Sequence, residues 1–276
     1  MIQRLFTLTG YFLRGLVFSL TGIFYILGTL AFWRVFFDPS QGTPDGDYYV
    51  LVTALFGAGL TFLVTLSVST RANQAVNYPL LVRLPSRVEH LVGVLGCSLL
   101  FSLTLQMTLA FLALFRGPQL TVGLVIDIPP IWVSVNVLAA VLALHATDLV
   151  AAGWSRVYVY GVLAVFLFGQ STTMTTVDWL TGRVNSFSTY FFQRGWDGLG
   201  GSAGRLANWL ATNGLDAFHN LFGLPFWPVK TISQAMIAGF FDTSQALGPA
   251  VLLLYATILF LLAADWFARK DLFLTE

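Results

Sequence analysis

The stretch RANQAVNYPLLVRLPSRVEHLVGVLG, residues 71–96, is the longest break between two strongly apolar runs in the first half of the chain. Arginine beside a membrane span favours the cytoplasmic side, and the stretch carries Arg71, Arg83 and Arg87. Apolar residues recur in it at steps of three and four, as on one face of a helix. These residues are Val76, Leu80, Leu81, Leu84, Val88, Leu91 and Val92. The stretch therefore predicts a short cytoplasmic helix between two spans, with an apolar face for lipid or a partner protein.

The composition supports a membrane protein. The chain has 276 residues, of which 57% are hydrophobic and 10% are charged, whereas about 25% are charged in a typical soluble protein. The net charge of +1 provides no basic patch, so nucleic acid is not an expected partner. Neither Lys230 nor Lys270 follows a glycine, which excludes the ending of a P-loop. The single cysteine, Cys97, can form no internal disulfide and is expected to be a small buried apolar residue.

The N-terminal stretch MIQRLFTLTGYFLRG mixes Arg4 and Arg14 with apolar residues. It predicts an amphipathic helix at residues 3–13 that lies in the membrane interface. The apolar run at 15–37 is too long for the core of a signal peptide and precedes no small-x-small cleavage site. We therefore expect this run to be the first membrane span.

Six membrane spans are predicted, because about 20 helical residues cross the hydrocarbon. The expected spans are about 15–37, 48–69, 91–115, 129–152, 157–174 and 249–267. Pro129 and Pro130 are expected in the first turn of the fourth span, where a missing N–H is tolerated. The predicted fold is all-α, a single transmembrane domain over residues 1–276. Its cytoplasmic segment is 71–90, and its outer segment is 175–248.

The positive charges near the span ends predict the orientation. The loop at 38–47 holds three aspartates and no cation, as expected outside. Only Arg34 and Arg116 are expected on that side in short loops. The cations expected inside are Arg4, Arg14, Arg71, Arg83, Arg87, Arg156, Arg269 and Lys270. The chain is therefore expected to be a multi-pass protein of the cell membrane with both termini in the cytoplasm.

Residues 175–248 differ from the rest, because ten glycines are mixed with aromatic and charged residues. The stretches NSFSTYFFQRGWDGLGG and LANWLATNGLDAFHNLFGLPFW predict amphipathic helices broken by glycines, and neither is a clean span. A folded cap, helices in the outer interface and re-entrant segments all remain possible. The tryptophans here either anchor the region in the interface or contact a substrate. They are Trp179, Trp196, Trp209 and Trp227.

No catalytic motif is found in the sequence, and the centres of the expected spans carry almost no ionisable groups. His145 and Asp148 lie three residues apart, and so do Asp216 and His219. Each pair could bind a metal or relay protons, but two ligands are too few for a convincing site. We favour a polar pair near the cytoplasmic end of the span for the first, with Asp148 within reach of Arg156 or water, and a solvated or interfacial helix for the second. No catalytic, cofactor or metal site is therefore predicted.

Taken together, these features resemble the membrane subunit of an ABC-2 type transporter. The shared points are the amphipathic N-terminal helix, the stretch LLVRLPSRVEHLVGVLG between spans two and three, and the outer region between spans five and six. The ending LFGLPFWPVKTISQAMIAGFFD, followed by a last span and WFARKDLF, is also similar. Many relatives carry an acidic residue before the leucine pair, where this chain reads RANQAVNYPLL and has none.

The resemblance implies a permease that has no enzymatic activity of its own and binds no cofactor. It would export a lipophilic or amphipathic substrate. Two copies of a cytoplasmic ATP-binding subunit would dock on residues 71–90 and on the N-terminal helix. A second permease chain, the same or similar, would complete the pathway across what the family implies is a bacterial inner membrane. Coupling is expected through apolar contacts and through arginines paired with acids of the partner. The residues expected to couple are Tyr78, Leu81, Arg83, Leu84, Arg87 and Glu89.

Two other functions remain open from the sequence. In one, the chain is a non-transporting scaffold or anchor of a larger complex, and residues 175–248 bind a protein. In the other, it is an integral membrane enzyme acting on lipid through His145 and Asp148 or through Asp216 and His219. The arginines of 71–90 could also serve for topological anchoring alone.

Overall fold

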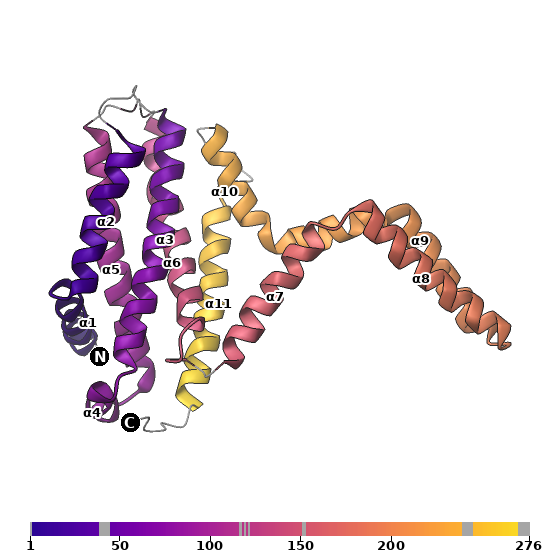
Figure 1. Cartoon of the computed structure of the whole chain (residues 1–276), viewed down its shortest axis with the longest axis horizontal. Helices are drawn as coiled ribbons and strands as arrows, with labels where there is room; N and C mark the ends of the chain where they lie inside the picture. Colours follow the sequence, from indigo (N-terminus) through magenta and orange to yellow (C-terminus); the bar gives the residue numbers. More distant parts are fainter. Residues whose placement is uncertain are drawn as a thin grey trace. The chain divides into compact units, whose positions relative to one another are not determined.

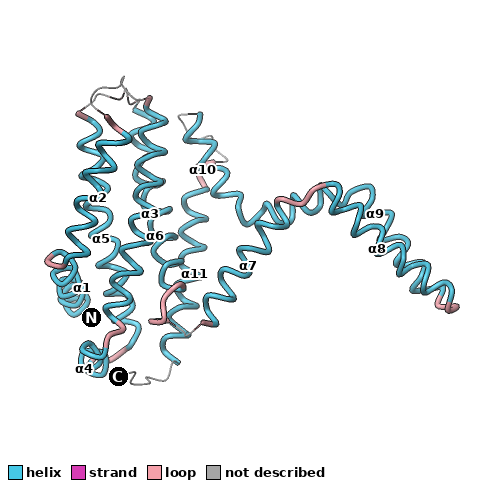
Figure 2. Tube along the Cα trace, viewed as in Figure 1, coloured by secondary structure: helices cyan, strands magenta, loops and turns pink. Residues whose placement is uncertain are grey.

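The computed structural model describes residues 2–38, 45–115, 118, 120, 122–150, 153–238 and 245–269, and all regular elements among them are helical. Figure 1 shows their arrangement, and Figure 2 shows the loops that join them. The longer helices are α1 (Ile2–Val17), α2 (Leu20–Phe36), α3 (Gly46–Ala72), α5 (Arg87–Leu114), α6 (Val122–His145), α7 (Trp154–Gln170), α8 (Met174–Gln193), α9 (Asp197–Gly223), α10 (Trp227–Ala238) and α11 (Gly248–Arg269). The short elements are η1 (Ala75–Asn77), α4 (Tyr78–Arg83) and η2 (Leu224–Phe226). The chain divides into unit 1, Met1–Val159 with Pro228–Glu276, and unit 2, Tyr160–Trp227.

Four stretches are long and apolar enough to cross a membrane: α3, α5, residues Val125–His145 of α6, and α11. Two further pairs of helices pass the same test together but are bent, α1 with α2 by 73° and α7 with α8 by 98°. The chain is therefore an all-helical, multi-pass membrane protein with four to six candidate spans.

The N-terminal helix is longer than predicted, because α1 continues to Val17 and the bend lies at Phe18 and Ser19. Ser19 is the N-cap of α2, and its Oγ accepts a hydrogen bond from the Gly22 N–H at 3.2 Å. This cap satisfies one of the free N–H groups at the start of α2. The separate helix α2 begins at Leu20, five residues after the expected start of the first span at residue 15.

The expected position of Pro129 and Pro130 is also wrong, because α6 begins at Val122 and both prolines lie inside it. The helix ends at His145, seven residues before the expected end of the span at 152. After this point the chain turns back, and Leu149 and Val150 are buried in the core of unit 1. Burial of these two side chains favours the turn over a continued helix.

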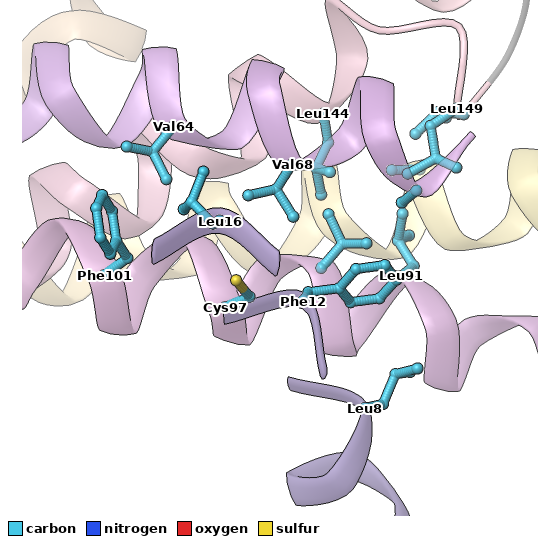
Figure 3. Close-up of a cluster of buried hydrophobic side chains, with 14 of the residues drawn as sticks. Leu8, Phe12, Leu16, Val64, Val68, Leu91, Cys97, Phe101, Leu144 and Leu149 are labelled. Carbon is cyan, nitrogen blue, oxygen red and sulfur yellow. The ribbon is translucent and has the colours of Figure 1, made fainter. Parts of the chain in front are cut away.

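The core of unit 1 is built on α3, which packs against both α5 and α6, while α11 packs against α6. One buried cluster draws apolar side chains from α1, α3, α5, α6 and α11, and Figure 3 labels Phe12, Leu16 and Cys97 among its members. A second cluster includes Tyr49, Leu109 and Trp132. Helix α1 therefore contributes to the interior of unit 1, together with α3, α5, α6 and α11.

A buried polar cluster joins α3, α5 and α6 between these apolar residues. The side chains of Gln106 and Asn136 are the only carboxamides in the four long candidate spans. The Asn136 Nδ2 donates to the Gln106 Oε1 at 2.6 Å, and the Gln106 Nε2 donates to the Thr53 backbone oxygen at 3.0 Å. One turn further along, the Thr61 hydroxyl donates to Ser102 at 2.8 Å. Such bonds between helices stabilise packing within the bilayer by about 0.6–2 kcal/mol each.

Unit 2 contains a hairpin of α8 and α9, joined at Gly195. Gly195 has φ +75°, a conformation that favours glycine and permits the tight turn. The Ser188 hydroxyl donates to the Gly200 backbone oxygen at 2.7 Å, and Val177 lies against Gly214. The prediction that glycines break these helices is wrong within α9, where they let α8 approach closely instead.

Candidate functional site

The segment between α3 and α5 does not form the single amphipathic helix that its periodicity predicts. It forms η1 and α4, and α5 begins separately at Arg87. Leu84 is extended, with ψ 138°, because the following Pro85 disfavours helical geometry at the residue before it. Ser86 then caps α5, accepting a hydrogen bond from the Val88 N–H at 3.3 Å. The prolines therefore leave a short helix, α4, between two long ones.

Asn77 fastens this segment to its neighbours. The Asn77 Nδ2 donates to the Arg71 backbone oxygen at 2.8 Å, at the end of α3. Its Oδ1 accepts a hydrogen bond from the Tyr11 hydroxyl of α1 at 3.2 Å. Asn77 is buried, so these two bonds satisfy an amide that would otherwise be costly to bury. The segment is thereby connected to both α1 and α3 through one side chain that the sequence analysis did not single out.

Three of the six predicted coupling residues lie toward the interior. Leu81 is 6% exposed and lines a small cavity with Leu149 and Phe267, and the half-buried Tyr78 lies beside the same cavity. Glu89 is 9% exposed, and its Oε2 makes no hydrogen bond with the described residues. In this arrangement these side chains hold the segment in place, and they do not form an outward surface.

The other three coupling residues are more accessible. Arg83 ends α4, is exposed, and makes no hydrogen bond or ion pair with the described part of the chain. Arg87 begins α5 and is half-buried. Leu84 is half-buried and lines a groove of about 470 Å³ between α1 and α4. We call this the α1–α4 groove; it is lined by Gln3, Arg4, Thr7, Leu8, Tyr11, Leu80 and Leu84.

The α1–α4 groove can accept an apolar side chain, because its walls include Leu8, Leu80 and Leu84. Its lining contains Arg4 and no carboxylate. With Arg83 unpaired among the described residues at the end of α4, the surface suits a partner that presents apolar and acidic groups together.

His90 is a fully buried polar residue that the sequence analysis did not single out. Its ring lies 5.4 Å from that of Phe12 in α1 and 6.2 Å from that of Phe267 in α11, centroid to centroid. The His90 ring also interacts with the backbone of Ala72 at the end of α3. His90 therefore marks the place where α1, α5 and α11 meet, next to α4.

Arg71 was expected to anchor the orientation of the chain, and the structure gives it a second contact. Its Nη1 donates to the Gly15 backbone oxygen at 2.9 Å, and its Nη2 donates to the Thr21 hydroxyl at 2.9 Å. These two acceptors lie on either side of the bend between α1 and α2. Arg71 therefore connects the end of α3 to that bend.

The two histidine–aspartate pairs do not assemble into metal sites. The His145 Nε2 lies 3.0 Å from the Leu259 backbone oxygen, while Asp148 pairs with Arg156, as the sequence analysis favoured. In unit 2, the His219 Nε2 lies 2.9 Å from the Thr172 backbone oxygen. Among the described residues, no group of three or more histidine, cysteine, aspartate or glutamate side chains could hold a metal ion.

The surface formed by α1, α4 and the start of α5 is therefore the candidate functional site. No family model matches the chain, and no curated protein or solved structure matches it either.

Proposed function

We propose that the chain is the membrane-spanning permease subunit of an ATP-driven ABC-2 type transporter. ATP is hydrolysed by a separate cytoplasmic subunit, present in two copies, and a second permease chain completes the pathway. The substrate is lipophilic or amphipathic and is exported. The observation that carries the proposal is that Asn77, the residue directly before α4, is bonded to both α1 and α3, because a partner that moves α4 would also move these helices through it.

The charge distribution supports a cytoplasmic α4 end of unit 1. In Figure 1 the end of α11 and the bend after α1 lie toward the same end of unit 1 as α4. This end carries Arg71, Arg83 and Arg269, whereas α3 begins with Asp45 and Asp47 at the other end. Arginine near short loops is retained on the cytoplasmic side. In this proposal α1 is the elbow helix, α2 is the first of six spans, both termini are cytoplasmic, and the membrane is a bacterial inner membrane.

Reversing the charge of Arg83 is expected to separate the chain from its ATPase. In a mild-detergent pull-down from the native host, mass spectrometry should find a P-loop ATPase in stoichiometric amount with the wild-type chain. Arg83→Glu should reduce it by about tenfold or more, because a charge-assisted hydrogen bond is replaced by repulsion of the partner's acids. Arg83 is exposed and unpaired among the described residues, so the variant should still fold and insert.

The matched control is Arg34→Glu, which makes the same change at the opposite end of unit 1, where Arg34 pairs with Asp38. It should retain the ATPase at the wild-type amount. The proposal is wrong if no ATPase accompanies the wild-type chain, or if Arg83→Glu retains as much of it as Arg34→Glu does.

A non-transporting scaffold is the second candidate, and the surface of unit 2 favours it. Trp179, Trp196 and Trp209 are all exposed on α8, α9 and their connection. Exposed aromatic groups of this kind occur at membrane interfaces and at protein–protein interfaces. In this case the same pull-down would recover a membrane or periplasmic protein in place of an ATPase, and deletions in unit 2 would release it.

A further inference from the structure

A cavity of about 720 Å³ lies at the bend between α1 and α2, bounded by the end of α3 and by η1. We call it the bend pocket. Its polar lining includes Arg14, Arg71, Gln74 and Asn77, and none of the described residues that line it is an aspartate or a glutamate. The volume is within the range of about 300–1,000 Å³ that is typical of small-molecule sites. The pocket therefore combines two guanidinium groups with room for a ligand and no competing carboxylate.

The two arginines differ in how they are held. Arg71 is fixed by its bonds to the Gly15 backbone oxygen and the Thr21 hydroxyl, which use two of its five N–H donors. The Arg14 side chain is exposed and makes no hydrogen bond or ion pair with the described residues. One guanidinium is thus positioned in advance, and the other is free to close on a ligand. Paired guanidinium groups suit a phosphate, which they can bind through forked hydrogen bonds.

Part of the lining of the bend pocket is apolar and exposed. Phe18 is 80% exposed and Val76 is 79% exposed, and both line the pocket. Because α1 leaves α2 at 73°, α1 runs close to the membrane plane when α2 crosses the bilayer. The bend then lies at the depth where lipid headgroups meet the hydrocarbon. A ligand with both a phosphate and an apolar body would satisfy both walls.

We propose that the bend pocket binds one anionic glycerophospholipid, with its headgroup phosphate between Arg14 and Arg71 and its glycerol and upper acyl chain against Phe18 and Val76. Basic pockets at helix ends on the cytoplasmic side are known to hold acidic lipid headgroups. The bound lipid joins α1, α2 and α3 at the bend and stabilises their arrangement. This proposal does not depend on an ATPase and holds equally for a transporter or a scaffold.

Titration of the purified, delipidated full chain with lipids in detergent, followed by native mass spectrometry, tests the proposal. Phosphatidylglycerol should bind the wild-type chain at one site about tenfold more tightly than diacylglycerol, which has the same acyl chains and glycerol but no phosphate. Arg14→Gln should weaken phosphatidylglycerol binding about tenfold, corresponding to one lost charge-assisted contact, and should leave the affinity for diacylglycerol unchanged. Arg14 is exposed and makes no side-chain bond to the described residues, so this variant should fold like the wild type, whereas Arg71→Gln would also loosen the bend.

The control variant is Arg269→Gln, which removes the same charge from an exposed position at the same end of unit 1, outside the pocket. It should bind phosphatidylglycerol like the wild type. Soluble glycerol 3-phosphate, added as a competitor, should displace the lipid only weakly because it lacks the apolar contacts. Equal affinities for the two lipids, or equal effects of Arg14→Gln and Arg269→Gln on phosphatidylglycerol binding, would overturn the proposal that the bend pocket binds the lipid phosphate. If glycerol 3-phosphate displaced phosphatidylglycerol when the two are present at equal concentration, the ligand of the pocket would be a soluble phosphate and not a lipid.

Discussion

Replacing Gly57 by leucine is expected to lower the unfolding temperature of the purified chain by about 10 °C or to prevent folding. A Cβ atom at Gly57 would lie 2.3 Å from the Gln106 Cδ, well inside contact distance. Gln106 cannot move aside freely, because its amide is bonded to Asn136 and to the Thr53 backbone oxygen. Overpacking costs about 1–3 kcal/mol, and each buried polar group left without a partner adds about 1–3 kcal/mol. A loss of about 3–5 kcal/mol corresponds to the stated shift in a chain of this size.

The measurement is the temperature at which half of the detergent-solubilised chain loses its monodisperse peak in size-exclusion chromatography. Gly59→Leu is the matched control, since a Cβ at Gly59 meets nothing within 4 Å although it lies on the same helix. It should shift the midpoint by no more than about 2 °C. Equal shifts for the two variants would show that α3 is not packed against Gln106 as described.

A double-mutant cycle then identifies Gln106 as the cause. Gln106→Ala should destabilise the chain by itself, because it leaves Asn136 without its acceptor. Combined with Gly57→Ala, it should remove the overlap, so the two changes should cost less together than the sum of their separate effects. Strict additivity would mean that the two residues do not contact each other.

The long apolar helices could be predicted from composition, because a run of about 20 apolar residues has few alternatives in a membrane protein. The helices α3 and α11 extend the predicted spans by only a few residues at either end. The Asp148–Arg156 pair was also anticipated, since both residues border one short turn. These features depend on neighbours in the sequence, and local patterns are sufficient for them.

The interior of the candidate site could not be predicted in the same way. Periodicity alone indicated one helix from Val76 to Val92, and the restriction that Pro85 places on Leu84 was stronger than that pattern. Leu81 is buried partly because Phe267 of α11 packs near it, almost 190 residues later in the chain. Arg71 bonds a backbone oxygen at Gly15, which no side-chain motif reveals. For Gln106 and Asn136 a signal was present, because two lone carboxamides in apolar spans must find partners.

Gly22→Ala is the second substitution for which we expect a large effect. Gly22 lies next to the bend between α1 and α2, and the substitution should weaken the packing of α1 on α5. A Cβ at Gly22 would lie 2.2 Å from the Leu16 backbone oxygen and 3.2 Å from that of Val17. Both are backbone atoms of the bend, so the overlap can be relieved only by opening it. Opening the bend would pull α1 away from α5, where Leu8 lies against Gly93 and Thr9 against Gly96.

Cys97, the only cysteine of the chain, reports this movement directly. It is 0% exposed and follows Gly93 by one helical turn, on the face of α5 that α1 covers (Figure 3). In detergent, N-ethylmaleimide should therefore modify the wild-type thiol slowly, and Gly22→Ala should raise the rate by about tenfold or more, corresponding to about 1.4 kcal/mol less stable docking of α1. Gly28→Ala, on α2 with nothing within 4 Å of its Cβ, should leave the rate unchanged. If Gly22→Ala reacts no faster than Gly28→Ala, the bend does not hold α1 over α5, and force on α4 would reach the spans through Asn77 and α3 alone.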